Sequence, residues 1–160
     1  MGQKLGAQRW PFVFILAAFL TVWANRAIAE DPLRPDPHLT PGAVLTTDTS
    51  QICTPGYAKS VRHTSGELKH IVYREYGINP RGGHYEIDHL ISLELGGADV
   101  RANLWPESYD TEPWNAHVKD RLENFLHREV CEGRIPIEQA QREIATNWIA
   151  AFEKYLGEPR

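Results

Sequence analysis

Two amphipathic segments near the C-terminus constrain the fold more than any other feature of this sequence. From Trp114 to about Val130, apolar residues recur at i, i+4, i+7 and i+8, and charged residues occupy much of the remainder. After Gly133 a second stripe begins at Pro136 and runs to the stop signal at Gly157. Each stripe predicts a helix with one buried face.

The middle of the chain predicts one further helix and a hairpin. The sequence over 64–67 has the Thr-x-x-Glu form of a capping box, and the apolar spacing after it predicts a helix over about 65–76. The run 85–91 is strand-like and leads to the turn-forming pair Gly96-Gly97. A second short strand beginning near Asn103 can pair back on the first. The expected fold class is α+β, a small hairpin with a crossing helix and flanking helices.

The first 29 residues have the form of a secretory signal peptide. Lys4 and Arg9 precede an apolar run over 11–24, and the small-residue pattern Ala27-Ile28-Ala29 follows. The alternative is an uncleaved membrane anchor, but the run is shorter than the roughly 20 apolar residues that a spanning helix needs. We expect residues 1–29 to be removed, the mature chain to be periplasmic or secreted, and no membrane attachment to remain.

The mature chain of 131 residues is long enough for one domain and short for two. Residues 30–51 contain four prolines and predict an extended arm, which leaves 52–160 as the compact domain. Removing the three basic residues of the leader leaves 14 basic and 21 acidic residues, a formal charge of −7. This charge argues against a protein that coats nucleic acid by broad electrostatic attraction, but a local site is compatible with it.

The only two cysteines are Cys53 and Cys131, both in the mature part. Export takes them to an oxidising compartment, where a disulfide can persist. The absence of a Cys-x-x-Cys spacing makes a zinc finger a poor match. We expect a disulfide between them, with two separate buried thiols as the alternative.

The window 85–106 reads YEIDHLISLELGGADVRANLWP and carries the chemical motif of the chain. Asp88-His89, Gly96-Gly97 and Asn103-Leu104 follow one another, and Asn103 stands 14 positions after His89. This order resembles the HNH (His-Me finger) family of nucleases, in which an Asp-His or His-His pair on one strand is followed by a Gly-Gly turn, an Asn-Leu on the return and a helix bearing a final His or Asn. The resemblance covers about 85–120 and implies a ββα-metal unit, a nucleic acid substrate and a divalent metal, foremost Mg²⁺.

The chemistry of the individual residues agrees with that resemblance. A histidine can take a proton from water at neutral pH, so His89 is the expected general base. Asp88 offers a carboxylate oxygen to a hard ion such as Mg²⁺. Asn103 is expected to hold the loop between the strands and so to orient the base, the role that the family implies. The structural alternative is that His89 is a satisfied core histidine and Asp88 a turn carboxylate.

Two geometric conditions bear on this site. Successive side chains of a strand point to opposite faces, so Asp88 and His89 can share a site only if the strand ends, bulges or twists near His89. On a helical wheel with Asn115 at 0°, the apolar residues centre within about 45° of Asn115 and His117 lies at about 200°. Mg²⁺ also prefers an amide oxygen to an imidazole nitrogen. We therefore expect Asn115 as the helix-borne metal ligand and His117 facing solvent.

Two residues outside the motif are expected to contact substrate. His84 stands just before the motif strand, and Arg62 is one of several basic residues suited to a phosphate. The tryptophans Trp105, Trp114 and Trp148 are expected to be core anchors, because each falls on or beside an apolar pattern.

The function expected from these residues is metal-dependent hydrolysis of phosphodiester bonds in DNA or RNA outside the cytoplasm. Two alternatives differ in class. One is a non-catalytic binding module that keeps the ββα scaffold, which the charge of −7 favours. The other is a metal-assisted hydrolase of a different phosphoester.

Overall fold

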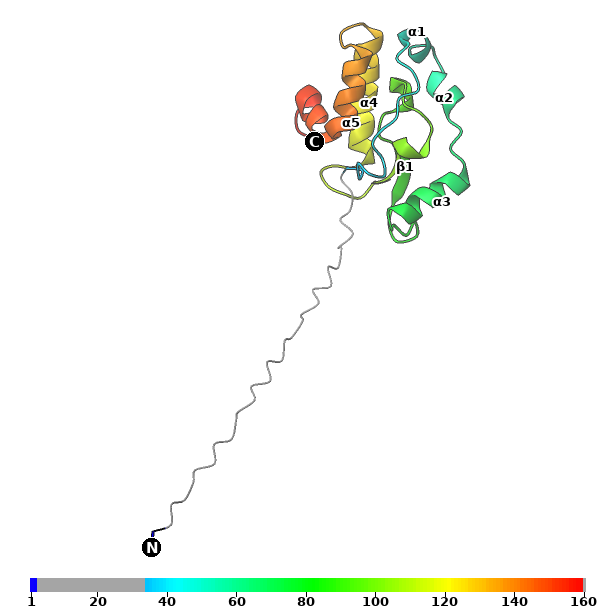
Figure 1. Cartoon of the computed structure of the whole chain (residues 1–160). Coiled ribbons are helices and arrows are strands. Elements are labelled where there is room, and N and C mark those ends of the chain that lie inside the picture. Colours follow the sequence, from blue (N-terminus) through cyan, green and yellow to red (C-terminus); the bar gives the residue numbers. More distant parts are fainter. Residues whose placement is uncertain (3–33, 160) are drawn as a thin grey trace.

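The computed structural model describes residues 1–2 and 34–159, so the expected signal peptide lies outside the described residues except for its first two. The described elements in chain order are α1 (Thr49–Ile52), α2 (Tyr57–Val61), α3 (Gly66–Glu75), β1 (Tyr85–His89), η1 (Leu93–Leu95), η2 (Arg101–Asn103), β2 (Leu104–Ser108), α4 (Ala116–Cys131) and α5 (Ile137–Leu156). Figure 1 shows α4 and α5 side by side, with β1 between them and α3. The mixture of a hairpin and several helices confirms the α+β class.

The two predicted amphipathic helices are α4 and α5. Asn115 caps α4, and α5 begins at Ile137, one residue after its predicted start. Within α5 the backbone leaves helical geometry at Asn147, whose side-chain oxygen accepts a hydrogen bond from the backbone N–H of Ala150 at 3.3 Å. The apolar faces of both helices form the main core, where Ile52, Ile91 and Leu95 from earlier elements complete it.

The strands pair antiparallel in the register Tyr85↔Ser108 to His89↔Leu104. In the loop between them, a Cβ on Gly96 would collide with the carbonyl oxygen of Thr46, and one on Gly97 with that of Ile91. The φ of Gly96 is also positive, at 76°. Both glycines are therefore required by close backbone approach, as the predicted turn implies.

Helix α3 covers one face of the hairpin through a small second core of Val72, Ile87 and Leu104. Its cap differs by one residue from the predicted capping box. The Ser65 hydroxyl accepts from the backbone N–H of Leu68, while the Thr64 hydroxyl donates to Asp99. Thr64 thus ties the segment before α3 to the loop between the strands.

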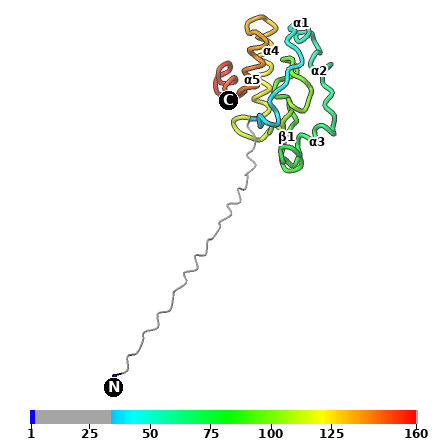
Figure 2. The backbone as a smooth tube through the Cα atoms, viewed as in Figure 1, coloured from blue at the N-terminus to red at the C-terminus, as the bar shows by residue number. Residues whose placement is uncertain are grey.

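Of the proline-rich arm expected over 30–51, the part that the structure describes is not extended throughout, because it includes a turn at 37–39 and the start of α1, and it hydrogen-bonds to the packed unit from Asp36 onward. The Thr40 hydroxyl donates to the Leu104 carbonyl at 2.7 Å, and the backbone N–H of Gly42 donates to the Ala102 carbonyl at 3.0 Å. Val44 forms an isolated bridge with Gly97. Figure 2 shows this segment running along the loop between the strands, so packing begins before the expected boundary at Ile52.

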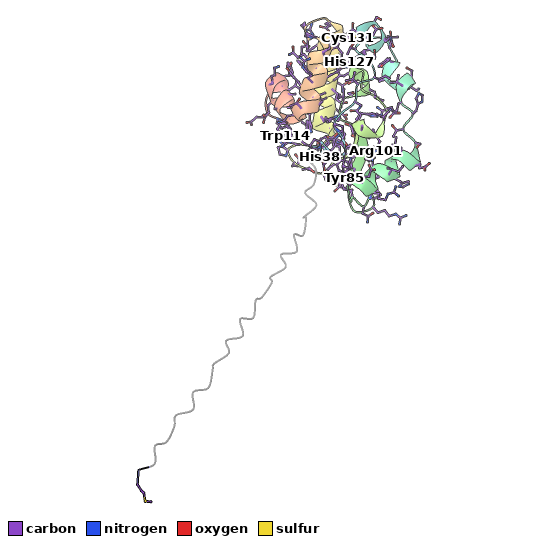
Figure 3. The ribbon with its side chains drawn as sticks, in the orientation of Figure 1. His38, Tyr85, Arg101, Trp114, His127 and Cys131 are labelled. Carbon is purple, nitrogen blue, oxygen red and sulfur yellow. A yellow bond between two sulfur atoms is a disulfide. The ribbon has the colours of Figure 1, made fainter. Side chains whose placement is uncertain are left out.

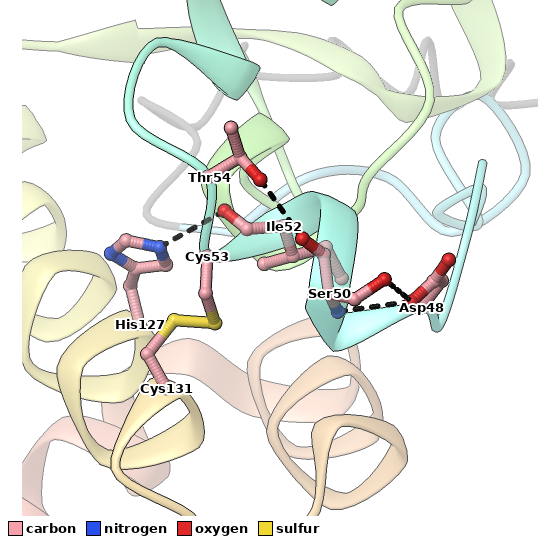
Figure 4. The surroundings of a disulfide bond; sticks show 7 residues. All are labelled: Asp48, Ser50, Ile52, Cys53, Thr54, His127 and Cys131. Carbon is pink, nitrogen blue, oxygen red and sulfur yellow. Dashed lines mark hydrogen bonds between the residues drawn. A yellow bond between two sulfur atoms is a disulfide. The ribbon is translucent and has the colours of Figure 1, made fainter.

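Cys53 and Cys131 form the expected disulfide, with their Cα atoms 5.6 Å apart. It joins the end of α1 to the end of α4, where His127 also lies against the Ile52 carbonyl at 3.4 Å (Figure 4). Closing a loop with a sequence separation of 78 stabilises a fold by about 4–5 kcal/mol on the chain-entropy account. Such a bond suits an oxidising, extracytoplasmic compartment.

Candidate functional site

The hairpin register separates the two residues of the Asp-His pair. No extra residue interrupts the pairing between Tyr85 and His89, so side chains alternate up to the last residue of β1. Asp88 faces α4, where it meets Lys119, and His89 faces the loop residue Asp99. The strand ends at His89 without bringing both side chains to one face.

Three carboxylates converge on the face that looks toward α4. One oxygen each of Glu86, Asp88 and Glu107 lie within 4.8 Å of one another. We call these three residues the carboxylate group. Alternation along β1 places Glu86 and Asp88 on the same face, and the register puts Glu107 directly across from Glu86.

Glu107 is the most buried member of the carboxylate group, at 2% exposure. Its Oε1 atom has no hydrogen-bond partner within the described part of the chain. Burial, together with the charges of Asp88 and Glu123, outweighs the attraction of Lys119 and raises the pKa of Glu107 well above its usual value. An oxygen in this state is an uncompensated acceptor, and a cation beside it would relieve the cost.

Lys119 of α4 is the buried cation of the site, at 1% exposure. Its ammonium donates to Asp88 at 2.5 Å, to the His89 carbonyl at 2.9 Å and to Glu123. These three acceptors use all three of its protons. Burial alone would lower the pKa of Lys119, but the carboxylates of Asp88, Glu123 and Glu107 outweigh burial and hold it well above its usual value.

The partners of Lys119 carry unequal shares of negative charge. Burial alone would raise the pKa of Asp88, but Lys119 outweighs it and keeps this pKa below its ordinary value. Burial and the nearby Asp88 charge instead raise the pKa of Glu123 to about 8, against the pull of Lys119. At neutral pH the central ion pair is therefore Lys119 with Asp88.

His89 forms a second pair on the opposite face of the hairpin. Its Nε2 lies 2.8 Å from an oxygen of Asp99, and its Nδ1 has no partner among the described residues. The Asp99 carboxylate also accepts from the backbone N–H of His63 and the hydroxyl of Thr64. A carboxylate on Nε2 holds the proton there and leaves Nδ1 as the basic nitrogen.

His89 is buried, at 1% exposure, and its partner Asp99 is held in turn by His63 and Thr64. Burial lowers the pKa of its imidazole, and the hydrogen bond that Nε2 donates to Asp99 offsets this only in part. The imidazole is therefore neutral at neutral pH, the state that a general base requires. Arg62 is itself exposed, and its charge contributes to the lowering.

Asn103 is fully buried and holds the loop between the strands. Its Oδ1 accepts from the backbone N–H groups of Ile91 at 3.0 Å and Ala43 at 3.3 Å. Its Nδ2 donates to the carbonyls of Ile91 and Ala98, each at 2.9 Å. The side chain thus has the loop contacts that the sequence led us to expect of it.

Asn115 and His117 face the directions that the helical wheel predicts. Asn115 is buried and His117 is exposed. The Oδ1 of Asn115 accepts from the backbone N–H of Val118 at 3.2 Å, which caps α4. The side-chain oxygens that converge with Asp88 come from Glu86 and Glu107.

His84 lies at the end of the hairpin away from the loop. Its side chain is 83% exposed, and its Nδ1 lies 3.7 Å from a carboxylate oxygen of Asp110. It is therefore open to a substrate, but it stands apart from the buried pair of His89 and Asp99.

Five residues around Asp88 and His89 were not predicted from the sequence, namely Glu86, Asp99, Glu107, Lys119 and Glu123. Two of them had a usable signal. On the wheel that places Asn115 at 0°, Lys119 falls at about 40° and Glu123 at about 80°, both on the inward side of the helix. A lysine and a glutamate at i and i+4 on an inward face indicate a buried ion pair.

Comparison with protein-family models, with curated proteins and with solved structures gave no match. Within the described residues, no helix has the length and apolar character needed to cross a bilayer.

Proposed function

We propose that this protein is an exported, metal-dependent nuclease of the HNH type that hydrolyses phosphodiester bonds of DNA or RNA. One observation carries the proposal. His89 has one ring nitrogen paired with a carboxylate and the other unpartnered among the described residues, and it directly follows Asp88, a member of a three-carboxylate group. A positioned neutral imidazole and a hard-cation site are the two components that such hydrolysis needs.

The donor set fits a divalent metal. Glu86, Asp88 and Glu107 offer converging carboxylate oxygens, and the Oε1 of Glu107 is buried with no partner in the described chain. Oxygen ligands of this kind suit Mg²⁺. We also propose Asn115 as a ligand, since its amide oxygen has two lone pairs and Val118 uses one. The ion, when bound, would polarise the phosphate and stabilise the departing oxygen.

The protein's own groups supply the remaining chemistry. Asp99 fixes the tautomer of His89, so that Nδ1 can accept the proton of an attacking water. Asn103 holds the loop that carries Asp99, and Arg62 and His84 are proposed to bind the substrate. Because His89 is buried and lies on the face of β1 opposite to Asp88, the proposed mechanism requires the end of β1 and the residues around His89 to move when substrate binds.

A chelator-controlled digestion tests the proposal. Mature protein is incubated with plasmid DNA, single-stranded RNA and a small chromogenic phosphodiester, each with Mg²⁺ and with Mg²⁺ plus EDTA. We expect cleavage of nucleic acid that EDTA abolishes. Cleavage of the small diester alone would identify the other class of phosphoester hydrolase. Absence of all cleavage would refute the nuclease.

A second candidate is a non-catalytic binding module, and one observation favours it. All three ammonium protons of Lys119 have acceptors, including Asp88, and His89 is buried against Asp99. The Asp-His pair can therefore be explained as structural. The same digestion separates the candidates, because a binding module leaves the length of the nucleic acid unchanged. In a gel-shift experiment such a module would still slow the migration of the nucleic acid.

A further inference from the structure

We propose that His84, Tyr109 and His117 form a stacking site for an unpaired nucleobase of the substrate. We call these three residues the ring rim. The inference rests on the proposed nuclease function and adds a substrate class to it: a nucleic acid strand whose bases are accessible, in preference to an intact duplex.

The ring rim is assembled from three separate parts of the chain. The backbone N–H of Tyr109 donates to the His84 carbonyl at 2.9 Å, which continues the strand ladder one step beyond the pair Tyr85↔Ser108. His117 comes from the first turn of α4. The ring centroids of Tyr109 and His117 are 5.0 Å apart, and those of His84 and Tyr109 are 6.5 Å apart in an edge-to-face arrangement.

Core formation does not account for this arrangement. The side chain of His84 is 83% exposed and His117 is exposed, so their contacts with Tyr109 bury little apolar area. Hydrophobic stabilisation scales with the area removed from water. By contrast, the aromatic cluster around Trp114 packs on the fully buried Phe152 of the main core. Solvent-open ring faces on a fixed backbone are what a stacking nucleobase requires.

The ring rim adjoins the carboxylate group through one hydrogen bond. The Tyr109 hydroxyl bonds to Glu86, which lies nearer this end of the hairpin than Asp88 does. A strand whose phosphate lies at the carboxylate group would therefore bring a neighbouring base to the rim.

Binding without cleavage tests the ring rim. Fluorescence anisotropy in EDTA and low salt measures the affinity of mature protein for a labelled single-stranded oligonucleotide and for an abasic oligonucleotide of equal length. We expect about 5- to 100-fold tighter binding of the strand that carries bases, the effect of one stacked base. The double variant His84→Ala/His117→Ala should bring the ratio of the two affinities close to one.

The matched control is His70→Ala, because His70 is an exposed histidine on α3, outside the rim. It should keep the full preference for bases. A ratio of affinities near one in the parent protein, or an undiminished ratio in the double variant, would overturn the proposal of the ring rim. The nuclease proposal would still stand if Mg²⁺-dependent digestion occurs. Failure to bind either strand together with failure to digest would overturn both.

Discussion

The Lys119 ammonium donates to the Asp88 carboxylate across 2.5 Å, from the first turn of α4 to the end of β1, and both groups are largely shielded from water. This ion pair joins the helix to the hairpin. It also determines the charge next to the carboxylate group, because the same ammonium bonds to Glu123 and to the His89 carbonyl.

Replacing Lys119 should destabilise the fold strongly. In Lys119→Met the charged partner Asp88 remains largely buried without a cation, and breaking one side of a buried pair costs about 3–5 kcal/mol. Urea denaturation at pH 7 measures the loss. The matched control is Lys59→Met, because Lys59 is exposed on α2. A loss below about 1 kcal/mol, the range of exposed ion pairs, would contradict the structural role of Lys119.

The raised pKa of Glu123 predicts a pH dependence of stability. The folded pKa is about 8 against an ordinary value of 4.5, so the folded state holds the proton more tightly than the unfolded chain. The contribution of Glu123 is therefore present below pH 4.5 and is lost as the pH rises through about 8. In Glu123→Gln, denaturation midpoints at pH 6 and pH 8.5 should differ less than in the parent. An unchanged difference would mean that Glu123 titrates normally.

If the proposed function is correct, substitutions of His89 and of Asp88 should impair cleavage in different ways. We expect His89→Ala to reduce cleavage by about 10²- to 10⁴-fold at saturating Mg²⁺, because it removes the base. Asp88→Ala should raise the Mg²⁺ concentration needed for half-maximal cleavage. Initial rates across a Mg²⁺ titration measure both, with His70→Ala as the control. Parental cleavage by His89→Ala would exclude this residue as the base.

Asn115 can be tested separately as a cap and as a ligand. Serine also caps helices, so the free energy of unfolding of Asn115→Ser should lie within about 0.5 kcal/mol of the parental value. That of Asn115→Ala should be lower by about 1 kcal/mol. The proposed metal role predicts that both variants need more Mg²⁺ for cleavage. If Asn115→Ser cleaves with the parental Mg²⁺ requirement, the side chain acts only as the cap of α4.

The disulfide should matter for stability more than for the site. Intact mature protein should be two hydrogens lighter than its reduced form by mass spectrometry, and reduction should cost up to about 4–5 kcal/mol. Figure 3 places Cys131 and Tyr85 at opposite ends of the domain, so nucleic acid cleavage by folded Cys53→Ser/Cys131→Ser should remain near the parental rate. Two free thiols in protein recovered from outside the cytoplasm would contradict this prediction.

Local patterns predicted the elements well because their causes are local. The apolar period of α4 and α5, the strand-like run before Gly96-Gly97 and the capping signal near Ser65 each depend on residues a few positions apart. The differences between the predicted and the observed ends of these elements are correspondingly small. The cap of α3 lies at Ser65 and not at Thr64, because the Thr64 hydroxyl is engaged by Asp99, far along the chain.

The sequence by itself determined α3, α4, α5 and the two strands, the Cys53–Cys131 pair, the loop-holding contacts of Asn103 and the inward direction of Asn115, but not the short helices α1 and α2. Only the tertiary structure decided which groups surround Asp88 and His89. That outcome depends on the strand register, which puts Glu107 beside Glu86, and on the docking of α4, which brings Lys119 to Asp88. Such contacts join residues distant in the chain, and no short-range period in the sequence encodes them.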